Sequence, residues 1–108
     1  MAFVSVNLPS LVIPSGGSTS QALADVGDAY AITIFTPATM TATQITVEVE
    51  PSSSGTSFVT LQSGGTDVQI AAGKATVIAP PGFKQIRVTS SSVEAQTDTF
   101  KMISHMAV

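Results

Sequence analysis

Alternation between apolar and polar residues, in short segments rich in β-branched side chains, is the feature that most limits how this chain can fold. In one such segment Ile45, Val47 and Val49 are predicted to point into a core, with Glu48 and Glu50 facing solvent between them. No stretch of about a dozen residues keeps the 3.6-residue period of a helix. The chain is therefore predicted to be all-β.

Further segments repeat this period of two, and clusters of Gly, Pro and Ser separate them at short intervals, as turns require. Many short strands joined by turns favour a small antiparallel β-sandwich or jelly-roll-like domain. A single turn near residues 21–24 is the best helical candidate. The predicted strands are 30–36, 45–50, 58–61, 67–70, 75–79, 84–89 and 97–103.

The same alternation predicts which side chains are buried. Tyr30, Ile32 and Ile34 share one face of a strand that is largely apolar on both faces. This strand is therefore expected to be central, with Tyr30 in the core. In the segment 84–89, Gln85 is expected to be exposed together with its charged neighbours.

The first residues are expected to form either an N-terminal arm or the first edge strand, over 1–14, with one β-sandwich domain over 15–108. The start lacks the basic region of a secretory signal. A strand-like arm can pair with an exposed sheet edge of a neighbouring protein, so its apolar residues are the candidate assembly interface. These residues are Phe3, Val4, Val6, Leu8, Leu11, Val12 and Ile13.

Charged residues make up only 10% of the 108 residues, 4 basic and 7 acidic. A typical soluble surface carries about 25% or more. A folded domain of 11.0 kDa exposes roughly 5,600 Å². Hydroxyl, glycine and apolar groups must cover most of that area, and such a surface does little to keep copies apart. We therefore expect a component of an assembly, the alternative being a single-copy protein coated by Ser and Thr.

The same composition excludes several classes of protein. Hydrophobic residues form 44% of the chain, which is too many for intrinsic disorder. The net charge of −3 argues against nucleic-acid binding, which depends on clustered Lys and Arg. No apolar run approaches the about 18 residues of a membrane-spanning helix.

Residues able to carry catalysis are few, and no enzyme, cofactor or metal site is predicted. There is no cysteine, hence no thiolate nucleophile. His105 is the only histidine and is expected to be exposed or at an interface, because a proton shuttle must be held by a partner. The pair Glu48 and Glu50 is expected to be solvated surface charge. Asp25 and Asp28 are expected to form a turn, because Ca²⁺ needs six to eight oxygens.

Several blocks of sequence, taken in order, resemble a group of small virion structural proteins from tailed bacteriophages. The resemblance covers about residues 15–103. The hairpin here has Ser54 where that group places Asp before Gly55. The matching blocks are SGGSTSQA (15–22), TPA (36–38), TATQITV (41–47), EPSSSGTSF (50–58), PPGFKQIRV (80–88) and SSVEAQ (91–96).

The resemblance implies a capsid decoration (cement) protein, which binds the outside of the head shell and bridges its subunits. It implies a homotrimer whose partner is the major capsid protein, with no nucleic acid, membrane or cofactor. The alternative is a tail-fibre or neck component, with a receptor or glycan as ligand. Glycan binding is disfavoured by the absence of Trp and the presence of a single Tyr.

Overall fold

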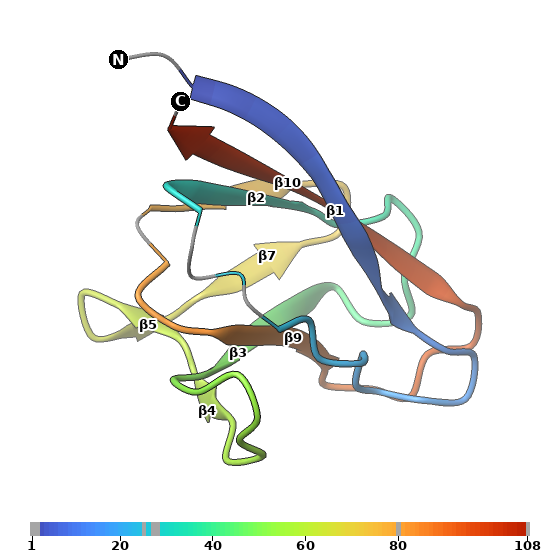
Figure 1. Ribbon diagram of the computed structural model, residues 1–108. Helices are drawn as coiled ribbons and strands as arrows, with labels where there is room; N and C mark the ends of the chain where they lie inside the picture. The colour runs from blue at the N-terminus through green and yellow to red at the C-terminus, as the bar shows by residue number, and fades with distance from the viewer. Residues whose placement is uncertain (1–2, 25, 27–28, 80, 108) are drawn as a thin grey trace.

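The computed structural model consists of β-strands in two antiparallel sheets packed face to face (Figure 1). It describes residues 3–24, 26, 29–79 and 81–107, and the side chains of 4–24, 26, 29–79 and 81–106. The accessible surface is 5622 Å², which is the area expected of a single folded chain of this mass. The prediction of a small antiparallel β-sandwich is confirmed.

One sheet, called sheet A below, contains both chain ends and has the strand order β1-β10-β2-β8. The strand β2 is therefore central, as its two apolar faces predict, while β1 and β8 are the two edges. All three pairings are antiparallel. The strands are β1 (Phe3–Ile13), β10 (Asp98–Ala107), β2 (Ala31–Phe35) and β8 (Ala75–Ile78).

The other sheet, sheet B, is built on β3, which pairs with β9 on one side and with β4 and β7 on the other. A small hairpin, β5–β6, extends from it. The bounds are β3 (Gln44–Glu50), β9 (Gln85–Ser90), β4 (Val59–Thr60), β7 (Gln69–Ala71), β5 (Gln62–Ser63) and β6 (Thr66–Asp67).

Residues 18–23 run along the free side of β9, so the helical turn predicted at 21–24 is wrong. The N–H of Leu23 donates to the Ile86 carbonyl at 2.9 Å, and the N–H of Ile86 donates back at 3.0 Å. A backbone that exchanges hydrogen bonds with a neighbouring strand is extended. This segment continues sheet B beyond β9.

The core lies between the sheets and is formed by the inward side chains of the alternating segments. Ile45, Val47 and Val49 of β3 are all buried, as predicted. Phe100 and Met102 of β10 are likewise fully buried, with the exposed Lys101 between them.

Three expectations about single side chains are wrong. Tyr30 is 57% exposed and lies just before β2, which begins at Ala31. Glu50 and Gln85 are only 4% and 7% exposed. The loop 51–57 folds over these two side chains and hydrogen-bonds to both.

Candidate functional site

The N-terminal segment is an edge strand of the sandwich, one of the two forms that the sequence left open. From Leu8 to Leu11 the chain advances three residues, while the paired strand advances only from Met102 to Phe100. The extra residue is a β-bulge, which shifts the alternation by one position. The bulge explains why the inward-facing apolar residues have even numbers before it (Val4, Val6 and Leu8) and odd numbers after it (Leu11 and Ile13).

The bulge places five of the candidate interface residues on the inner face of sheet A. Val4, Val6 and Leu8 lie opposite Met106, Ser104 and Met102, and directly opposed residues share a face. Leu11 and Ile13 follow on the same face.

Only part of this inner face is accessible. Leu11 and Ile13 have 0% exposure and belong to the core, so the expectation that they contact a partner is wrong. Sheet B covers this end of β1. Leu8 is partly buried against the core, and Val12 is half-buried on the opposite face. The side chain of Phe3 lies outside the described residues.

Val4 and Val6 remain exposed, at 43% and 45%. Figure 1 shows the reason: the start of β1 and the end of β10 lie far from the strands of sheet B, at the upper left. The inner face of sheet A is therefore uncovered at the start of β1, whereas Ser104 of β10, opposite Val6, is only 3% exposed. We call Val4 and Val6, with the half-buried Met106 beside them, the terminal apolar patch.

The outer edge of β1 is open over its first half. Among the described residues no strand pairs with it. The Gln21 side chain occupies the second half, where it accepts from the Val12 N–H and donates to the Ser10 carbonyl, both at 2.9 Å. Residues 3–8 carry no charge, although edge strands are commonly protected by charged side chains. This stretch can therefore pair with another strand.

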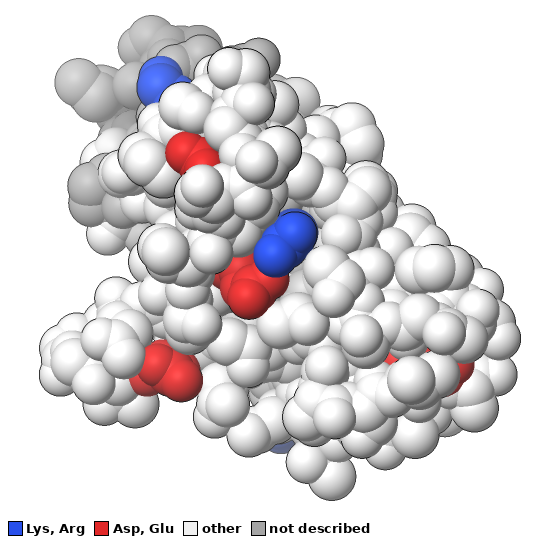
Figure 2. Space-filling view, turned by 90° about the horizontal axis from the view of Figure 1, so that it is seen from below, with Lys and Arg blue, Asp and Glu red and all other residues white. Residues whose placement is uncertain are grey.

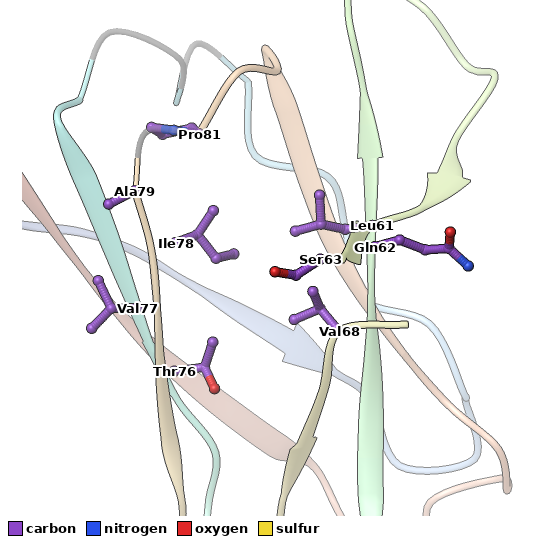
Figure 3. A pocket seen from close by; sticks show the side chains of 9 residues that line it. All are labelled: Leu61, Gln62, Ser63, Val68, Thr76, Val77, Ile78, Ala79 and Pro81. Carbon is purple, nitrogen blue, oxygen red and sulfur yellow. The ribbon is translucent and has the colours of Figure 1, made fainter. Parts of the chain in front are cut away.

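The opposite edge of sheet A borders a groove of about 530 Å³, which sequence reasoning missed. In Figure 3 Thr76 and Ile78 of β8 point into it, facing Leu61, Ser63 and Val68, while Val77 points away. None of the lining residues is charged. The groove exists because the two sheets separate at this edge, which a local pattern does not encode.

His105 lies on the outer face of sheet A, between two hydroxyl groups. Its Nδ1 is 3.2 Å from Ser5 Oγ and its Nε2 is 3.3 Å from Thr33 Oγ1. Within the described part of the chain, neither nitrogen is hydrogen-bonded to a carboxylate. A catalytic histidine relies on such a group to fix its tautomer. The arrangement instead links three neighbouring strands.

A pair of buried carboxyl groups, also missed from the sequence, closes the sandwich at the end opposite the termini. Glu94 is fully buried: Oε1 accepts from the Thr41 N–H at 2.8 Å, and Oε2 accepts from the Ala42 N–H at 3.0 Å and the Ser90 hydroxyl at 2.8 Å. Asp98 is 1% exposed, and its Oδ2 receives no hydrogen bond from the described residues.

These two groups have opposite pKa shifts. Burial favours the neutral form of Glu94, but hydrogen bonds from Asp98, Ser90 and two backbone N–H groups outweigh it and hold the pKa of Glu94 below its ordinary value. Burial raises the pKa of Asp98, and its hydrogen bond to Glu94 raises that pKa further. Asp98 therefore keeps its proton to higher pH than Glu94, and only the protonated carboxyl of Asp98 can donate to the Glu94 carboxylate.

The shared proton makes stability depend on pH. The raised pKa of Asp98 contributes stability that is lost as pH rises through that pKa. The lowered pKa of Glu94 contributes stability that is lost as pH falls through it. We expect Asp98→Asn to abolish the loss of stability that occurs as pH rises through the pKa of Asp98, because an amide donates to Glu94 at every pH.

At pH values above the raised pKa of Asp98 we expect Asp98→Asn to raise the free energy of unfolding by about 1.5–3 kcal/mol, the range for a hydrogen bond to a charged group. Urea unfolding followed by circular dichroism, from mildly acidic to mildly alkaline pH, checks this. If the free energy of unfolding of Asp98→Asn fell between acidic and neutral pH as steeply as that of the parent, the shared proton would be contradicted.

Glu50 organises the loop 51–57. Its carboxylate accepts from the N–H groups of Ser52 at 3.0 Å and Ser57 at 2.9 Å. These bonds, led by that of Ser52, hold the pKa of Glu50 below its ordinary value. Glu48 instead pairs with Arg87 at 2.7 Å, and this guanidinium lies 4.2 Å from the Phe58 ring centre. The expected pair of solvated carboxylates is therefore wrong.

Gly55 is required by this arrangement, because a Cβ there would lie 2.5 Å from the Glu50 carboxylate. We expect Gly55→Ala to displace Glu50 from its partners and to lower the melting temperature by about 4–8 °C. Ser54→Ala, at an exposed position of the same loop, is the control and should melt like the parent. Equal melting of the two variants would show that the loop does not depend on Glu50.

Asp25 and Asp28 lie outside the described residues. The described ones contain no group of three or more metal-ligating side chains. They also contain no helix that is long and apolar enough to cross a membrane.

Comparison with known proteins gives no relative. No protein-family model, curated protein or solved structure matches this chain.

Proposed function

We propose that this chain is a virion structural protein of a tailed bacteriophage, a capsid decoration (cement) protein that acts without catalysis. It forms a homotrimer on the outside of the head shell and bridges copies of the major capsid protein. The observation that carries the proposal is a sheet with two open, uncharged edges on a surface poor in charge. The blocks of sequence that resemble phage virion proteins support it.

The low charge is visible on the molecular surface. Figure 2 shows one face on which a few charged groups are separated by wide uncharged areas. Burying such a surface against protein requires little desolvation of charge, which is the costly part of forming an interface. Because a decoration protein binds assembled shells and not free subunits, its binding stabilises the assembled state by mass action.

The outer face of sheet A is the surface we assign to shell contact. Phe35 and Val77 are 39% and 62% exposed there, and the half-buried Ile103 lies in the same row as Val77. The single described charge among them is Lys101, paired in register with Phe35. Apolar patches of this kind mark interaction sites.

We expect Phe35→Lys to lower occupancy on phage heads at least about tenfold, because a charge at this position must be desolvated on binding. Val59→Lys is the matched control, since Val59 is 59% exposed on sheet B. Heads stripped of the protein are incubated with each variant and sedimented. Equal occupancy of the two variants would remove sheet A from the contact with the shell.

Copy number in virions tests the function itself. Virions of the phage that encodes the chain are separated on a gel and quantified against the major capsid protein. The proposal expects hundreds of copies. About a dozen or fewer would indicate a neck or tail component, and absence from virions would refute the proposal.

A further inference from the structure

The inner face of sheet A has exposed apolar side chains at one edge and an open groove at the other. At the β1 edge, Val4 and Val6 project from the uncovered inner face. At the β8 edge, Thr76 and Ile78 line a groove that no described side chain fills. One edge offers exposed apolar side chains, and the other offers a space for them.

We propose that β1 of one copy adds to the β8 edge of the next copy, so that Val4 and Val6 close the groove of that neighbour. The inference rests on the proposed function and deepens it, because it states how the copies of the trimer join. The occupant of the groove is thus a second copy of this chain.

The strand directions permit this pairing. The strands of sheet A alternate in direction, so β1 and β8 run in opposite directions. A copy related by rotation about an axis along the strands therefore presents its β1 antiparallel to β8, with the inner faces of the two sheets on the same side. Two different edges form such an interface, which is head-to-tail and generates a ring when the rotation between copies closes.

The lengths of the two open edges also agree. The side chain of Gln21 blocks β1 beyond residue 8, leaving 3–8 for pairing. The strand β8 has 4 residues, so the open part of β1 is long enough to cover it. In the extended sheet, side chains on the inner face of β1 lie beside those of Thr76 and Ile78 and reach toward Leu61 and Val68 across the groove.

Charge does not oppose the contact. Neither the open part of β1 nor β8 contains a charged residue, and neither does the groove lining. The competing arrangement pairs β1 with β1 of another copy. It would bury the valines against each other but would leave the groove empty, so the pairing of β1 with β8 explains more of the structure.

Disulfide cross-linking tests the pairing, because the chain has no cysteine of its own. V4C and V6C are each mixed with T76C and I78C under mild oxidation. We expect a mixed disulfide in at least one of these combinations, since directly opposed residues of antiparallel strands are close enough for one. V6C mixed with V77C is the control: Val77 points away from the groove, and we expect at least about tenfold less product.

The other outcomes overturn the proposal. A V6C disulfide with itself, without mixed product, would show pairing of β1 with β1. No mixed product in any combination would show that these edges do not meet. As a second measurement, V6E should weaken self-association at least about tenfold in sedimentation. N7E, one residue along on the other face, should associate like the parent, and equal effects of the two would also count against the pairing.

The failure of this inference differs from the failure of the proposed function. Hundreds of copies in virions without any cross-link between β1 and β8 would overturn the inference alone. Cross-linked rings of a chain that is absent from virions would overturn the function alone.

Discussion

Replacing Glu94 with alanine is expected to lower the free energy of unfolding by about 3–5 kcal/mol. Its carboxylate accepts hydrogen bonds from Thr41, Ala42 and Ser90. Ala42 and Ser90 are themselves buried, so their donors would lose their acceptor without gaining water. A buried donor without an acceptor costs about 1–3 kcal/mol. A domain of this size has a total stability of only about 5–15 kcal/mol.

The effect is large because Glu94 joins three loops at one end of the sandwich. Its side chain binds the 41–42 segment, and its backbone exchanges hydrogen bonds with Gly16 at 2.8 Å and Gly17 at 2.9 Å. Val93→Ala is the matched control, since Val93 is 63% exposed next to it in the chain. Urea unfolding of both variants gives the comparison. A difference of less than about 0.5 kcal/mol between them would show that the cluster is not structural.

The second large effect is expected from Leu11→Ala, at about 2–5 kcal/mol of lost stability. Leu11 is fully buried in the core, whereas Val6, on the same face of the same strand, is 45% exposed. Val6→Ala is therefore expected to cost less than about 1 kcal/mol. Self-association should change in the opposite order, with Val6→Ala weakening it more.

Denaturant unfolding and sedimentation of the same two variants separate these roles. Comparable losses of stability would mean that the core extends to the start of β1. A loss of association with Leu11→Ala alone, at unchanged stability, would restore the interpretation of Leu11 as an interface residue.

Local alternation was sufficient to predict most of the strands. The segments around Ile45, Ile86 and Phe100 form β3, β9 and β10 with the predicted faces inward, because each strand needs only one apolar face against the core. In β1 the inward-facing positions change from even to odd residue numbers across Pro9 and Ser10. This change also follows from the alternation once a β-bulge is allowed.

The candidate site depended on contacts between distant residues, which alternation does not report. Whether a valine or leucine of β1 is buried depends on how far sheet B extends beneath it. Nothing in the residues next to Glu50 and Glu94 predicts that these carboxylates are buried, yet both are, because loops close over them. The groove beside Ile78 likewise reflects the spacing between sheets.

The molar mass of the purified chain, measured by light scattering over a wide range of concentrations, tests the central claim most directly. That claim is that a sheet with two open, uncharged edges is completed by other copies of the same protein. We expect a particle of three times the 11.0 kDa chain mass. A mass of 11.0 kDa at every concentration, up to the millimolar range, would contradict the account.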